Sequence, residues 1–185
     1  MKMYDIGGQE IKLEKIKSFY LLNNNINYSE YLFSKYYKEV IINNPYLSST
    51  FLQIERTLKR IEVKNNLLYK NNSPLLKEEL YLKDLLGTLK SVEIIKKMSS
   101  VSHVYEIRMN MNYTKTRILF FVFGSKEESL INPSLILSFG FEKRTDRTVK
   151  DMTQLLTEET QFIRDNLYNE DFNKDSIGVE LYHEI

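Results

Sequence analysis

The 185-residue sequence contains no cysteine and no tryptophan, and only six glycines, three prolines and two histidines. The lack of cysteine excludes disulfides, thiolate catalysis and cysteine-ligated metals. Because His103 and His183 are the only histidines, a histidine-rich metal site is excluded as well. We therefore expect a protein that works with no metal and no other cofactor.

Long apolar runs are also missing. Residues 1–20 alternate charged and apolar side chains, and no stretch approaches the roughly 18 apolar residues that a membrane span needs. This pattern predicts no signal peptide and no contact with a membrane, so a cytoplasmic location is the expectation.

The chain does have enough apolar residues, 42%, for a sizeable core in one domain of ordinary size. Its aromatic residues are 13 tyrosines and 10 phenylalanines. Tyrosine joins an apolar ring to a polar tip, which suits half-buried sheet faces and the stacking of nucleobases alike. Composition leaves both interpretations open.

The net charge of +1 conceals an uneven distribution. From Lys90 to Lys150, eleven basic and six acidic residues give a net charge of +5, whereas residues 169–185 carry five acids and one lysine, a net of −4. A basic middle segment indicates an anionic partner. The acidic tail is either a solvated end or a strand-like mimic that shields the basic segment.

The first ninety residues favour helices, after a possible strand at residues 16–22. Ser29 suits the N-cap of a helix that continues to about Ile42, and the run Asn43-Asn44-Pro45 ends it. Apolar residues at helical spacing predict a second helix after Ser48 or Ser49, and Gly87 is placed to end a third. The second helix has the apolar stripe Phe51, Ile54, Leu58 and Ile61, and the third spans Pro74 to about Leu86.

The pattern changes after Lys97. Residues 104–109 alternate at period two, residues 116–123 are the strongest strand signal in the chain, and residues 135–141 form a third strand. Short connections make these three an antiparallel meander, followed by a helix at residues 148–167. The predicted class is α+β. Its parts are a helical region at 1–90, a sheet core with a closing helix at 91–168, and the acidic tail at 169–185.

Basic residues recur where these strands begin or end. Arg108 ends the first strand, Arg117 opens the second, and Lys143 and Arg144 follow the third. In an antiparallel meander such positions can converge on one face of the sheet. Fixed cations there suit a phosphodiester, because they neutralise the charge that builds on phosphorus oxygens during attack.

Three segments carry a resemblance to a known family: Tyr-Glu-Ile-Arg at 105–108, Thr-Arg-Ile-Leu-Phe-Phe at 116–121 and Phe-Gly-Phe-Glu-Lys-Arg-Thr at 139–145. In this order they resemble the HigB-like, phage-derived branch of the RelE/ParE toxin superfamily. The resemblance covers about sixty residues. It implies a small antiparallel sheet packed against two helices, and a type II toxin held silent by a helix-turn-helix antitoxin. It also implies cleavage of mRNA, often on the ribosome, without a metal.

The resemblance assigns roles residue by residue. Arg108, Arg117 and Lys143 match the basic residues of the three motifs and would bind and stabilise the scissile phosphate. The residues that would steer the RNA backbone are Lys96, Lys97, Lys115, Arg144 and Arg147.

The chain departs from the family pattern at Phe139, where the family often has histidine. Phenylalanine cannot transfer a proton, and His103 is the one residue nearby that could take that role. Two other interpretations remain open. The arginines could pair with Glu106, Glu142 or Asp146 on a solvated sheet face. The basic face could instead belong to a non-catalytic protein-binding module, such as a phage anti-defence factor or a gyrase-inhibiting toxin of the ParE type.

Overall fold

The computed structural model spans residues 1–185 and describes most of them. The described backbone comprises residues 3–4, 10–11, 17–21, 28–83, 87–111, 114–123, 134–143, 152–168 and 177–181. Side chains are described for residues 30–83, 87–110, 114–122, 135–143 and 152–165.

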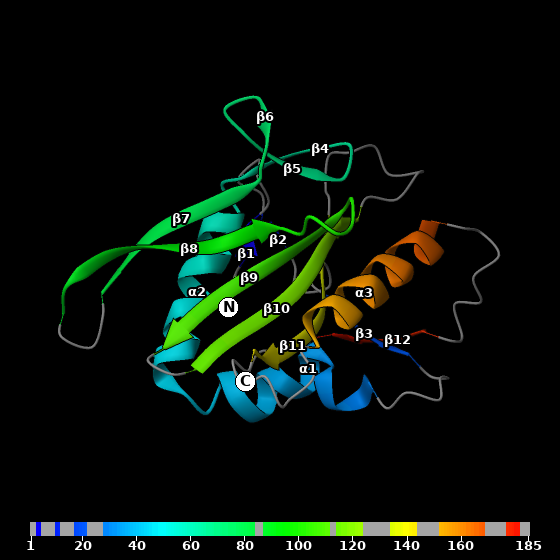
Figure 1. Ribbon diagram of the computed structural model, residues 1–185, viewed down its shortest axis with the longest axis horizontal. Helices are drawn as coiled ribbons and strands as arrows, with labels where there is room; N and C mark the ends of the chain where they lie inside the picture. The colour runs from blue at the N-terminus through cyan, green and yellow to red at the C-terminus, as the bar shows by residue number, and fades with distance from the viewer. Residues whose placement is uncertain are drawn as a thin grey trace.

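Helices and strands alternate in groups along the chain (Figure 1). The helical segments are η2 (Tyr28–Tyr31), α1 (Phe33–Tyr36), the π-helical η3 (Tyr37–Ile41), α2 (Pro45–Leu58) and α3 (Thr153–Tyr168). The early strands are β1 (Met3–Tyr4), β2 (Glu10–Ile11), β3 (Lys17–Leu21), β4 (Glu62–Lys64), β5 (Leu67–Lys70) and β6 (Ser73–Pro74). The later strands are β7 (Lys77–Lys83), β8 (Leu89–Lys97), β9 (Val104–Met111), β10 (Thr114–Phe123), β11 (Ser134–Glu142) and β12 (Ile177–Leu181).

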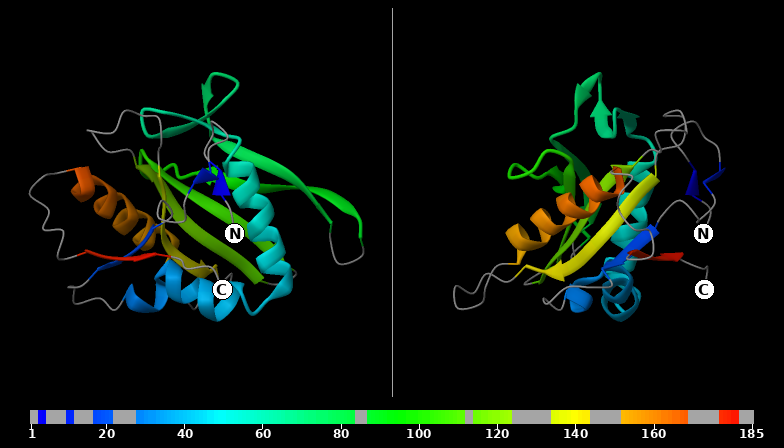
Figure 2. Two further views of the ribbon diagram at one scale, coloured as in Figure 1. Left: turned by 180° about the vertical axis from the view of Figure 1, so that it is seen from behind. Right: turned by 90° about the vertical axis from the view of Figure 1, so that its right-hand side faces the viewer.

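A seven-stranded sheet in the order β12-β3-β11-β10-β9-β8-β7 organises the molecule. Strands β7 to β11 form a continuous antiparallel meander, and β3 joins its far side parallel to β11. Helices α1 and α2 cover one face of this sheet and α3 covers the other (Figure 2). The described helices include none that is long and apolar enough to cross a membrane.

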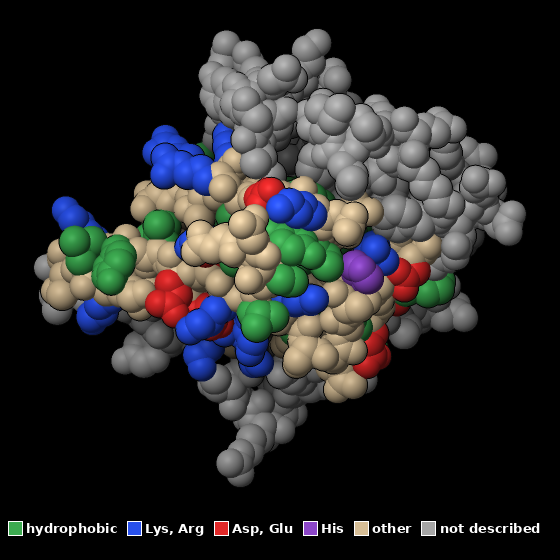
Figure 3. Space-filling view, turned by 90° about the horizontal axis from the view of Figure 1, so that it is seen from above, with side chains coloured by type: hydrophobic (Ala, Val, Ile, Leu, Met, Phe, Trp, Pro, Cys, Tyr) green, Lys and Arg blue, Asp and Glu red, His purple; other side chains and the backbone are tan. Residues whose placement is uncertain are grey.

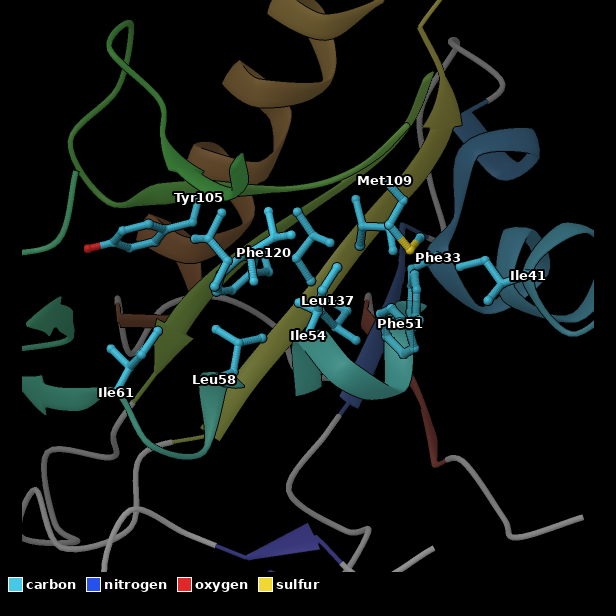
Figure 4. Close-up of a cluster of buried hydrophobic side chains, with 14 of the residues drawn as sticks. Phe33, Ile41, Phe51, Ile54, Leu58, Ile61, Tyr105, Met109, Phe120 and Leu137 are labelled. Carbon is cyan, nitrogen blue, oxygen red and sulfur yellow. The ribbon is translucent and has the colours of Figure 1, made fainter. Parts of the chain in front are cut away.

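Helix α2 begins where its sequence supplies a cap. The Asn44 side chain accepts hydrogen bonds from the backbone N–H groups of Tyr46 (3.1 Å) and Leu47 (3.2 Å), and Pro45 occupies the first turn. Leu47, Phe51, Ile54 and Leu58 recur at helical spacing and are buried. Phe51, Ile54 and Leu58 lie against the sheet (Figure 4). This burial fixes α2 across the meander.

The core on the α2 side combines that helix with every second residue of the central strands. Tyr105, Ile107 and Met109 of β9 point to this side, as their alternation predicts. Tyr105 stacks on Phe120, with ring centroids 5.5 Å apart, and its hydroxyl accepts a hydrogen bond of 3.0 Å from the Leu68 backbone. The small β4-β5-β6 sheet is thereby attached to the main sheet.

The core on the α3 side depends on a β-bulge. The register of β10 and β11 shifts between Leu119 and Phe120, so Leu119 faces Phe139 while Phe120 faces Leu137. Consecutive residues Ser138 and Phe139 therefore both reach the α3 side. Ser138 Oγ lies 2.8 Å from Thr160 Oγ1 of α3. The apolar part of this core is Leu32, Val104, Leu119, Phe121, Ile136, Phe139, Phe141, Leu156 and Ile163.

These elements confirm the α+β class, the strands of the meander, the strand near residues 16–22 and the helices predicted near residues 29–42 and 148–167. The second predicted helix is confirmed as α2, but its predicted start after Ser48 or Ser49 is wrong, because Asn44 caps it, and Ile61 lies beyond its end at Leu58. The predicted order of elements is wrong, because strands β4 to β8 stand between α2 and the three-stranded meander. The predicted helix at Pro74–Leu86 is also wrong. Its described residues form β6 and β7, and Gly87, with φ +80°, follows β7 in the connection to β8. Glu78, Leu80 and Leu82 alternate inward on β7, and pairing with β8 overrides the helix propensity of Glu, Leu and Lys.

The strands β4, β5 and β6 are joined by two hairpin turns that the sequence pattern did not predict. Asn65-Asn66 joins β4 to β5 and Asn71-Asn72 joins β5 to β6, and all four residues have φ between 50° and 60°. Positive φ at both central residues is the mark of a type I′ turn, which asparagine tolerates better than most residues. The two Asn-Asn pairs were therefore the available signal for these hairpins.

Gly140 of β11 permits a close approach of Tyr36 of α1 to the sheet. A Cβ atom at this position would lie 2.7, 2.8 and 2.9 Å from Cδ1, Cγ and Cβ of Tyr36. We expect Gly140→Ala to lower the free energy of unfolding by about 1–3 kcal/mol, as overpacking does elsewhere. Urea denaturation followed by circular dichroism measures the loss, and it should be smaller in a Tyr36→Ala background, which removes Cγ and Cδ1. An equal loss in both backgrounds would contradict this explanation.

Candidate functional site

Arg108 and Arg117 lie side by side, as the meander predicts. They are direct register partners on β9 and β10, on the face of the sheet that α3 covers further along. The sequence motifs therefore bring their two arginines together. Glu106 was one of the three acids predicted as alternative partners of the arginines, and the structure confirms this pairing, whereas Glu93 was not predicted.

Glu106 and Glu93 accompany the arginines, and we call these four residues the charged quartet. Arg108 Nε donates to Glu106 Oε2 at 2.5 Å, and Arg108 Nη1 donates to Glu93 Oε1. The other oxygen of Glu106 lies 3.6 Å from Arg117 Nε. Two cations thus face two carboxylates, and the quartet is electrically balanced.

Burial separates the quartet into an inner and an outer pair. The side chains of Arg117 and Glu106 are 7% and 2% exposed, whereas those of Arg108 and Glu93 are 25% and 29% exposed. Arg117 Nη1 donates to Asn110 Oδ1 and to the Thr116 carbonyl, both at 2.8 Å. Burial lowers the pKa of Arg117, and the charge of Glu106 opposes that shift. Arg117 is thus a buried cation whose compensation depends on Glu106.

The outer pair continues into a strip of exposed charges across β8 and β7. Lys96 stands opposite Glu106 and Glu79 opposite Glu93 in the strand register. Lys77 Nζ donates to Glu79 at 2.9 Å, and Ser91 Oγ donates to the same carboxylate at 2.8 Å. We call Lys77, Glu79, Ser91, Glu93, Lys96 and Arg108 the charged strip. Acidic and basic side chains also lie side by side on the face shown in Figure 3.

The remaining predicted residues are spread along the sheet. The backbone N–H of Lys143 donates to the Lys115 carbonyl at 2.8 Å, so these two residues meet where β10 begins and β11 ends. Lys96 and Lys97 end β8 on the other side of β9. Arg144 and Arg147 lie outside the described residues, as does Asp146, one of the acids considered as a partner.

No proton-transferring group accompanies the arginines at the positions that the resemblance suggests. Phe139 is fully buried in the core on the α3 side. His103 precedes β9 and lies five residues from Arg108, a separation of about 17 Å along an extended strand. Its Nδ1 lies 2.6 Å from Ser102 Oγ, and its pKa is lowered by burial and by the charges of Arg164 and Lys97. The described residues also contain no group of acids and histidines that could hold a metal ion.

Comparison of the chain with protein-family models, curated proteins and solved structures finds no match. The resemblance to the RelE/ParE superfamily therefore stays a prediction from three short motifs.

Glu55 of α2 is a second buried acid, remote from the strip. It is 7% exposed, its Oε2 lacks a hydrogen-bond partner, and burial raises its pKa to about 7 against the opposing charge of Lys59. Because the folded-state pKa exceeds the unfolded value of 4.5, the stability linked to this group is present below pH 4.5 and is lost as pH rises through 7.

Glu55→Gln should therefore stabilise the protein at pH 8, by up to about 3 kcal/mol, and have little effect at pH 4. Urea denaturation at a series of pH values measures this difference. Glu39→Gln on the neighbouring η3 segment is the matched control, since Glu39 is exposed. A gain that did not vary with pH would show that titration of Glu55 is not its cause.

Proposed function

We propose that this protein is a non-catalytic protein-binding module that uses the charged strip to contact its partner. The observation that carries the proposal is the charged quartet. Both arginines assigned to the scissile phosphate already face carboxylates, and the inner one is almost completely buried. A phosphate would have to displace Glu106 or Glu93 to reach them.

The composition of the surface supports the same function. A nucleic-acid site needs an excess of cations, because its affinity comes largely from neutralised phosphates. The charged strip and the inner pair together contain four bases (Lys77, Lys96, Arg108 and Arg117) and three acids (Glu79, Glu93 and Glu106). A surface of both signs suits a protein partner of complementary charge, which fixes the orientation and the register of binding.

Two measurements test the proposal. Expression of the intact chain should leave total mRNA and bacterial growth unchanged. A tagged chain should form a complex of fixed stoichiometry with a protein, and Lys96→Glu should weaken that complex at least tenfold. Lys35→Glu on α1 changes charge equally at an exposed position off the strip and is the matched control. Cleavage of mRNA by the unmodified chain would contradict the proposal.

The endoribonuclease toxin is the second candidate, and one observation favours it. Lys115 and Lys143 meet where β10 begins, two residues before Arg117 on the same strand. Cations therefore flank the charged quartet at the start of β10. In this case Arg108, Arg117 and Lys143 would stabilise the phosphate, and a helix-turn-helix antitoxin would silence the protein. Growth arrest that Arg108→Ala abolishes would support this candidate, and RNA binding would weaken as salt rises.

A further inference from the structure

Strand β7 is an open edge of the main sheet. Among the described strands only β8 pairs with it, and β9 pairs with β8 only over Ile95–Lys97. The outer parts of β7 and β8 therefore form a two-stranded ribbon that projects from the sheet (Figure 1, Figure 2). A ribbon of this kind is marginally stable alone, and an open edge is a template for another strand.

The ribbon also exposes apolar side chains. Tyr81 is 70% exposed and Leu89 is 60% exposed. Tyr81 stands opposite Ser91, and Leu89 stands opposite Lys83, so the two apolar side chains are diagonal neighbours on one face. Figure 3 shows hydrophobic side chains gathered at this projecting end of the molecule.

The hydrogen bonding of β7 defines which of its backbone groups face outward. The N–H of Lys97 donates to the Leu76 carbonyl, which makes residue 76 a hydrogen-bonded position toward β8. Backbone groups alternate in direction along an antiparallel strand. The register of β7 and β8 shifts between Glu78 and Glu79, but the extra residue, Ile94, lies on β8, so the alternation along β7 continues. Even-numbered residues of β7 therefore bond to β8, and Glu79, Tyr81 and Lys83 present their N–H and C=O groups to the open edge.

We propose that a second copy of this chain pairs with β7 edge to edge, antiparallel, about a two-fold axis at Tyr81. In this register Tyr81 faces Tyr81 of the second copy, and Glu79 faces its Lys83. Leu80 faces Leu82 of the second copy on the opposite side of the sheet. Each outward-facing pair exchanges two backbone hydrogen bonds, and the main sheets of both copies become continuous.

Charge disfavours the registers centred on Leu80 and Glu79, and the register centred on Leu82 lacks the favourable Glu79–Lys83 pair. A two-fold axis perpendicular to the sheet pairs residues that lie on the same face. The alternative registers therefore differ in the residue through which the axis passes, one residue at a time. Centring on Leu80 would place Lys77 opposite Lys83, and centring on Glu79 would place two carboxylates together. Like charges directly opposite each other destabilise a strand pair, whereas Glu–Lys and Tyr–Tyr pairs stabilise it.

The dimer goes beyond the proposed function and does not depend on it. The two-fold axis keeps the charged strips of both copies on one face of the joined sheet. Two strips on a single face would bind a repeated or symmetric partner by avidity.

Sedimentation velocity on the full chain tests the dimer. Between about 1 and 100 μM, the range of moderate interfaces, the mass should approach twice the 22.1 kDa of one chain. Tyr81→Pro removes an outward N–H while leaving the bonds to β8, so this variant should be monomeric and keep its circular dichroism spectrum. Phe162→Lys is the control. It changes an exposed aromatic side chain on α3, far from β7, and should stay dimeric.

A charge exchange tests the register itself. Glu79→Lys and Lys83→Glu each place like charges opposite each other and should shift the mass toward the monomer. The double variant restores opposite charges and should restore the dimer. A monomeric unmodified chain at 100 μM would overturn the proposal, and failure of the double variant to recover would overturn the register at Tyr81.

Discussion

Glu106→Ala should lower the free energy of unfolding by about 3–5 kcal/mol, the cost of leaving a buried charge without its partner. Glu106 is 2% exposed and lies against both guanidinium groups. After its removal Arg108 keeps Glu93, but the hydrogen-bond acceptors that Arg117 keeps, Asn110 and Thr116, are neutral, and Glu93 acts on it only from a greater distance. Because the chain lacks tryptophan, far-ultraviolet circular dichroism in a urea titration is the suitable measurement.

Glu93→Ala is the matched control for this prediction. It removes a carboxylate from the same quartet, but at a position that is 29% exposed, so the expected loss is about 1 kcal/mol or less. The double variant Glu106→Leu with Arg117→Met should recover most of the loss, because apolar residues can replace a buried ion pair at little cost. A loss below 1 kcal/mol for Glu106→Ala would show that the quartet does not hold the sheet.

Phe139→His should destabilise the protein by about 3 kcal/mol or more and should not create a nuclease. The new imidazole would occupy the fully buried position of Phe139 among the apolar side chains of the core on the α3 side. It would exchange apolar contacts for a polar group that this core cannot solvate. The histidine of the family motif would therefore be placed where no RNA can reach it.

The stability of the Phe139→His variant should also depend on pH. Burial disfavours the imidazolium, so the folded-state pKa falls below the unfolded value of about 6.5. The stability is then retained above pH 6.5 and declines as pH falls below it. Phe139→Leu, which keeps an apolar side chain, should lose about 1 kcal/mol with no such dependence. Cleavage of RNA by Phe139→His would contradict the interpretation of this position.

The Glu106 and Phe139 variants test whether the family motifs form a catalytic site in this protein. The motifs correctly indicated that Arg108 and Arg117 meet, since alternation along β9 and β10 fixes which side chains share a face. They did not indicate Glu93, which lies fifteen residues before Arg108 and reaches it only because β8 pairs with β9. The motifs alone therefore favoured a phosphate site where the structure contains a balanced quartet.

The sequence by itself determined the elements whose local pattern and burial agree. The alternation in β9 and β10 and the apolar spacing of α2 predicted their types. The run Asn43-Asn44-Pro45 was interpreted as the end of the preceding helix, whereas Asn44 and Pro45 also begin α2. Only the tertiary structure decided the rest. Residues 77–83 have good helix formers but became a strand, because pairing with β8 buries Leu82 and partly buries Leu80. The arginines by themselves predicted a phosphate site, but Glu93 of the neighbouring strand β8 contributes to balancing their charge. Electrostatic balance depends on distances between strands, which no local pattern contains.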